Sequence, residues 1–151
     1  YILQWAAGVE RYFWYDWGKP KRARRRIDMR MSDNRPTAAG EAFNQVRDWL
    51  VGRTMTFCRN TGKEGVPAMT WQWGLEDKKG ALSYIGWRGS AKLSVTLPDA
   101  SWHIPDAWRV DSVVTLDGKR SRLKEGALIT IGENPILLTL ERDERESRGS
   151  A

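Results

Sequence analysis

The residues of this chain with the greatest chemical potential are its tryptophans. The chain of 151 residues holds nine of them, and a tryptophan ring is unfavourable to leave in water. The rings therefore either build an aromatic-rich core or lie on a ligand surface. Exposed aromatic rings serve proteins that bind polysaccharides or single-stranded nucleic acids. The composition thus favours binding by aromatic side chains, with a purely structural role as the alternative.

The chain has few of the residue types that build nucleophilic or metal-binding sites. Cys58 is the single cysteine, which excludes an internal disulfide and a metal site built on thiolates. His103 is the single histidine, so a cluster of histidines cannot bind a metal. No serine-centred motif accompanies His103, and the sequence does not indicate a catalytic triad. We expect no metal site and no cofactor.

Positive charge is concentrated in one segment. The chain has a formal charge of +6, and residues 19–30 hold seven basic residues against Asp28 alone. The other residues sum to zero, so the basic character belongs to one loop rather than to the fold. Such a run is compatible with a solvated loop, an anionic-glycan contact or a nucleic-acid contact. No apolar run approaches the length of a membrane span, and we expect no membrane partner.

The elements that must position these residues fall in two groups. Residues 1–8 are typical of the end of a helix that Gly8 terminates. Residues 9–17 form a nearly continuous apolar and aromatic run, which is typical of a strand buried on both faces. After a long polar loop, Thr37 is placed to cap a second helix, whose apolar stripe ends before Gly52.

The second group begins at Arg53, where short alternating or apolar runs follow one another between Gly, Pro, Asp and Asn residues. This spacing predicts an antiparallel sandwich over residues 53–142. Asp117-Gly118 between two runs is typical of a hairpin. The small, charged residues 143–151 are predicted to be a disordered tail. The predicted strands are 54–58, 68–73, 81–87, 91–97, 108–116, 119–123, 127–131 and 135–141.

Two stretches resemble a known family. Residues 8–17 (GVERYFWYDW) with residues 35–52 (RPTAAGEAFNQVRDWLVG) resemble the last strand and helix of a clan-A type (β/α)₈-barrel glycoside hydrolase. Residues 110–141 (VDSVVTLDGKRSRLKEGALITIGENPILLTLE) resemble the final hairpin of the β-sandwich appended to such barrels. The resemblance implies residues 1–52 as the end of the barrel and residues 53–142 as the sandwich. The predicted fold class is therefore an α/β barrel fragment followed by an all-β domain.

The resemblance also implies a function, the hydrolysis of O-glycosidic bonds in a poly- or oligosaccharide. In this clan two glutamates about 5 Å apart perform the reaction with retention of configuration. Both glutamates belong to earlier barrel strands, which would precede Tyr1, so we expect no catalytic residue in this chain. The expected partners are a carbohydrate substrate, with an acidic polysaccharide as one hypothesis, and the remainder of the barrel. Without those neighbours, residues 1–52 are expected to fold poorly.

The same resemblance places sugar contacts at the end of the run in residues 9–17. A tryptophan at the end of the last barrel strand commonly stacks on a sugar ring in this family. We expect Trp14 to be that platform, Asp16 to accept sugar hydroxyls, and Trp17 to lie at the mouth of the site. A core role for Trp14 and an ion pair for Asp16 remain open, and Trp71 and Trp73 are expected to be sandwich core.

Two other functions remain open. A carbohydrate-binding β-sandwich module without an enzyme would explain the number of tryptophans, although not the strand and helix predicted before the sandwich. A nucleic-acid binder would use the basic residues 19–30, and its affinity would fall steeply with added salt. We favour a carbohydrate partner over nucleic acid.

Overall fold

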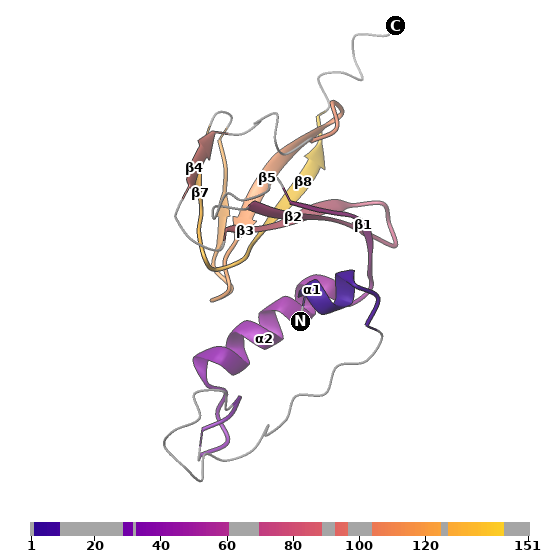
Figure 1. The fold of residues 1–151 in the computed structure, drawn as a ribbon. Coiled ribbons are helices and arrows are strands. Elements are labelled where there is room, and N and C mark those ends of the chain that lie inside the picture. Colours follow the sequence, from indigo (N-terminus) through magenta and orange to yellow (C-terminus); the bar gives the residue numbers. More distant parts are fainter. Residues whose placement is uncertain are drawn as a thin grey trace, which may run out of the picture. The chain divides into compact units, whose positions relative to one another are not determined.

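The computed structural model describes residues 2–9, 29–31, 33–60, 70–88, 93–96, 104–124 and 127–143. The chain divides into two units, Tyr1–Val51 and Gly52–Ala151. The helices lie in the first unit and the antiparallel strands in the second (Figure 1).

The first unit opens with helix α1, Ile2–Ala6. The backbone N–H of Gly8 donates to the carbonyl of Trp5 at 2.9 Å, and Gly8 has a φ of 81°. A left-handed residue directly after a helix is the usual position for glycine, because other residues are strained there. The helix end predicted over residues 1–8 is confirmed.

Helix α2, Ala38–Leu50, begins where the sequence predicts it. The Thr37 hydroxyl accepts a hydrogen bond from the backbone N–H of Gly40 at 3.1 Å, which satisfies one of the free donors of the first turn. Gly52, with a φ of 77°, lies just past the end of the helix. The C-terminal half of the predicted apolar stripe is buried, through Val46, Trp49 and Leu50, whereas Ala39 at its start is exposed.

The second unit contains eight described strands, and they lie within a few residues of the predicted ranges. Six form one sheet in the order β1-β2-β3-β8-β5-β6, and two form the separate pair β4-β7. Every pairing is antiparallel. The strands are β1 (Arg53–Asn60), β2 (Thr70–Asp77), β3 (Leu82–Arg88), β4 (Leu93–Thr96), β5 (Trp108–Val114), β6 (Arg120–Arg122), β7 (Leu128–Ile131) and β8 (Ile136–Arg142).

A hydrophobic core lies between the six-stranded sheet and the β4-β7 layer (Figure 1). Strand β7 contributes Ile129 and Ile131, and the backbone N–H of Arg88 donates to the carbonyl of Gly132 at 2.8 Å, which joins the two layers. Alternate residues of the central strands face this core, as the period of a strand requires. From β3 and β8 these are Tyr84, Ile136, Leu138 and Leu140.

The predicted fold class, an α/β barrel fragment followed by a sandwich, is wrong. The protein is mostly antiparallel β-sheet, and its described residues show no repeat of parallel strands alternating with helices. The helix α2 passes through Gly52 into β1, which pairs antiparallel with β2. The prediction failed because a helix next to an apolar run does not specify which strands that run pairs with. The pairing of parallel strands is what defines a barrel. The predicted barrel strand, apart from Val9, lies outside the described residues.

Candidate functional site

The three residues predicted to contact sugar, Trp14, Asp16 and Trp17, lie outside the described residues. The same holds for His103 and for most of the basic segment 19–30. Its described end, Arg30, donates from Nη1 to the Asn34 side-chain oxygen at 3.0 Å. The structure therefore directs attention to two other places, both on the six-stranded sheet.

Three tryptophans stack on one face of this sheet. Trp71 and Trp73 are two residues apart on β2, and Trp87 on β3 lies opposite Trp71 in the register. The ring centroids of Trp73 and Trp87 are 4.1 Å apart with an interplanar angle of 13°, and those of Trp71 and Trp87 are 6.3 Å apart. Trp73 has no exposed surface, whereas Trp71 and Trp87 are half-buried. Trp73 is thus buried, as expected, but on the face opposite the core between the two layers, because it pairs with Ile85 and the core residue Tyr84 points to the other side. Its two neighbours retain partial access to solvent.

A row of hydroxyl side chains crosses the same face. Ser83 on β3 pairs with Thr139 on β8, and Thr139 pairs with Ser112 on β5. The Ser112 and Thr139 oxygens are 2.6 Å apart, and Arg53 donates from Nη1 to the Ser83 oxygen at 2.7 Å. Ser112 is fully buried and Ser83 nearly so. Buried hydroxyls need such partners, so this row is part of how the sheet is built.

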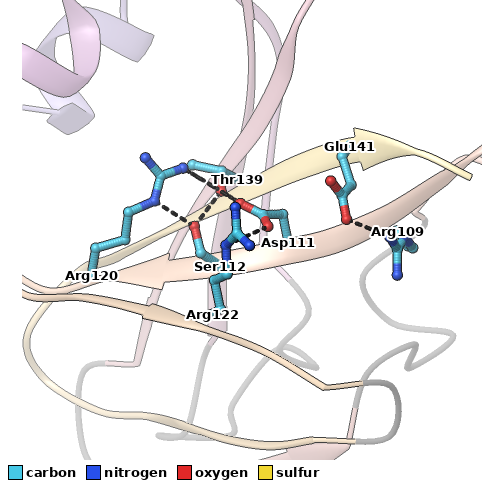
Figure 2. Close-up of polar contacts among 7 residues, drawn as sticks. All are labelled: Arg109, Asp111, Ser112, Arg120, Arg122, Thr139 and Glu141. Carbon is cyan, nitrogen blue, oxygen red and sulfur yellow. Dashed lines mark hydrogen bonds and ion pairs between the residues drawn. The ribbon is translucent and has the colours of Figure 1, made fainter.

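Two arginines of the edge strand β6 extend the row (Figure 2). Arg120 donates from Nε to Ser112 at 2.8 Å and from Nη2 to Thr139 at 3.1 Å, and its Nη2 lies 3.5 Å from the Asp111 carboxylate. Arg122 places its Nε 3.8 Å from the other oxygen of Asp111. A single carboxylate therefore lies between two guanidinium groups.

A bulge in β5 explains how one strand supplies both Asp111 and Ser112. The register with β8 shifts between Val110 and Ser112. Neighbouring strand residues normally point to opposite faces, but a bulge bends the strand and redirects one side chain. Both side chains consequently reach Arg120. The next pair along the sheet is separate, because Arg109 binds Glu141 one to one at 2.7 Å.

Two described carboxyl groups have shifted pKa values, and both are carboxylates that stabilise turns rather than candidate general acids. The Thr115 hydroxyl, and then Lys119, lower the pKa of Asp117 to about 2. Backbone N–H groups of Ala81 and Lys79 lower the pKa of Asp77. A general acid of a glycosidase needs the opposite shift, since it must hold a proton near neutral pH.

The single thiol also lacks the features of a nucleophile. Desolvation by partial burial raises the pKa of the Cys58 thiol. A thiol with a raised pKa is less often the reactive thiolate. Within the described ranges, no three His, Cys, Asp or Glu side chains gather in a way that could hold a metal ion.

The sequence did not indicate the arginine cluster, because its members are far apart in the chain. Asp111, Arg120 and Thr139 come from three strands, and only the sheet order β8-β5-β6 brings them together. The summed charge outside residues 19–30 is zero, so the sum does not reveal the local excess of positive charge at Arg120 and Arg122. The sequence feature that could have indicated the cluster is the Asp117-Gly118 hairpin. This hairpin folds β6 back on β5 and sets Arg120 and Arg122 beside Ser112.

Comparison with protein-family models, with curated proteins and with solved structures finds no match. Among the residues that the structure describes, no helix is both long and apolar enough to cross a membrane.

Proposed function

We propose that the unit Gly52–Ala151 is a carbohydrate-binding module and that it serves a glycoside hydrolase without carrying the catalytic groups. The observation that carries this proposal is the stacked pair Trp71 and Trp87, which is half-buried where β2 begins and β3 ends. An indole ring offers a flat apolar surface that matches the C–H face of a pyranose. Because the fully buried Trp73 stacks against both rings, the pair is held in place before a ligand arrives.

The state of four described carboxylates favours binding over catalysis. Retaining glycosidases need two carboxyl groups about 5 Å apart, one of which is protonated near neutral pH. Asp77 and Asp117 have lowered pKa values at turns, and Asp111 and Glu141 each face an arginine. These groups suit structural ion pairs and turn caps.

The proposal is tested by measuring binding of the 151-residue chain to a panel of soluble polysaccharides, by affinity electrophoresis and by tryptophan fluorescence. We expect Trp71→Ala and Trp87→Ala each to weaken binding at least about tenfold, which corresponds to ~1.4 kcal/mol. The matched control is Trp108→Ala. Trp108 is also half-buried, but it pairs with Arg142 at the opposite end of the sheet, so its loss should leave affinity within about twofold.

Circular dichroism of each variant must show the native β-sheet signal, so that lost binding is not lost folding. Absence of binding to every polysaccharide in the panel would contradict the proposed function. Binding that survives both Trp71→Ala and Trp87→Ala would remove these rings as its site.

A further inference from the structure

The cluster on β5, β6 and β8 carries an excess of positive charge. Asp111 alone faces two guanidinium groups, with one oxygen 3.5 Å from Arg120 and the other 3.8 Å from Arg122. The neighbouring cations are compensated one to one, Arg109 by Glu141 at 2.7 Å and Lys119 by Asp117 at 3.1 Å. One positive charge therefore remains at Arg120 and Arg122, and an anion would complete the arrangement.

Arg120 is also held in one orientation. Its Nε and Nη2 are bound by the hydroxyls of Ser112 and Thr139, and both residues belong to central strands of the sheet. Figure 2 shows the remaining terminal nitrogen pointing away from the cluster. The side chains of Arg120 and Arg122 are 58% and 89% exposed. A guanidinium that is fixed on one side and open on the other binds an anion with little loss of side-chain entropy.

We propose that Arg120 and Arg122 bind a carboxylate of an acidic polysaccharide, as in a chain of uronic acids. This inference rests on the proposed carbohydrate binding and names the class of sugar. The planar fork of Arg122 matches a carboxylate through two parallel hydrogen bonds. Arg120, whose Nε and Nη2 already donate to Ser112 and Thr139, adds its remaining terminal nitrogen. A nucleic-acid backbone fits less well, because its recognition uses an extended basic surface with several phosphate contacts. The described edge offers two arginines with a single excess charge.

The test compares two polymers with the same sugar backbone, polygalacturonate and its highly methyl-esterified form, each titrated into the 151-residue chain at two salt concentrations. The variant is Arg120→Gln with Arg122→Gln, and the matched control is Arg109→Gln, which removes a paired arginine of similar exposure on the adjacent strand. We expect the double variant to bind polygalacturonate at least tenfold more weakly. The control should stay within twofold, and affinity for the ester should not change.

Each other outcome has a defined meaning. Equal weakening by Arg109→Gln would overturn the inference, because it would reveal only a general charge effect. Equal binding of the acid and the ester by the native chain would also overturn it, and the proposed function would stand if Trp71→Ala still weakened that binding. A single-stranded oligonucleotide that binds more tightly than polygalacturonate, and loses affinity in the double variant, would assign the arginines to nucleic acid instead. Failure of every polysaccharide would refute the proposed function itself.

Discussion

At the scale of single residues, a neighbouring aromatic ring fills the space above Gly74, which has no side chain of its own. Gly74 lies in the middle of β2, where a glycine normally weakens a strand. A methyl group added there would collide with the Phe57 ring and the Thr56 hydroxyl. The Phe57 ring lies over the glycine and meets Tyr84 edge to face, with centroids 5.2 Å apart and an interplanar angle of 76°. The glycine is therefore required by the positions of the Phe57 ring and the Thr56 hydroxyl.

This contact predicts a measurable coupling. Gly74→Ala should destabilise the protein by about 1–3 kcal/mol, because the added methyl group forces the Phe57 ring to move. In a Phe57→Ala background the same change should have a smaller effect, since the ring is gone and only the Thr56 hydroxyl remains in the way. Urea unfolding of the four proteins of this cycle measures the difference. Additive effects would show that the clash is relieved in some other way.

At the scale of elements, two hairpins share one turn design. In the turn from Asp77 to Ala81 and in the turn from Thr115 to Lys119, the first and last residues join through a backbone hydrogen bond of 3.0 Å. Each turn has a left-handed glycine before its last residue, Gly80 or Gly118. This pattern is that of a three-residue hairpin loop with a glycine bulge. An aspartate accepts backbone hydrogen bonds in both turns.

The lowered pKa of Asp117 predicts an acid-dependent loss of stability. Interactions with the Thr115 hydroxyl and Lys119 favour the ionised form and bring the pKa down to about 2 in the folded chain, below the ordinary value of roughly 3.9 for the unfolded chain. The stabilisation is therefore fully present above about pH 4.5 and is lost as the pH falls towards 2. Asp117→Asn should lower the melting temperature at pH 6 and have little effect at pH 2.

Thermal melts between pH 2 and 7 check this expectation. Asp106→Asn, a change of the same type at an exposed turn residue, is the control and should give a much smaller difference at pH 6. A melting-temperature deficit of Asp117→Asn that is the same at every pH would mean that the ionised carboxylate is not the stabilising group.

At the scale of the whole molecule, the two units differ in how completely they supply their own core. The hydrophobic cluster between the sheet and the β4-β7 layer draws all its residues from Gly52–Ala151. Its members come from strands far apart in sequence, since β8 lies between β3 and β5. Such non-local pairing makes the sheet a single cooperative unit.

We therefore expect residues 52–151, expressed alone, to unfold in one cooperative transition, whereas residues 1–51 alone should not. The described residues of the first unit include few buried apolar side chains, and short isolated helices are marginal in water. Urea titrations followed by far-ultraviolet circular dichroism distinguish the two outcomes. A cooperative transition in the fragment 1–51 would contradict this expectation, as would its absence in the fragment 52–151.

Local features of the sequence determined the elements. Thr37 and Gly52 delimit α2, the Asp117-Gly118 pair forms a hairpin, and alternating runs mark the strands, because caps, turns and side-chain periods depend on neighbouring residues alone. Only the tertiary structure decided the sheet order, the separation of β4-β7 as a layer, and the meeting of Arg120, Ser112 and Thr139. A strand's pattern specifies which side chains share a face, but its partner is chosen by packing across the whole chain. For that reason the sequence located the strands correctly and still suggested a barrel.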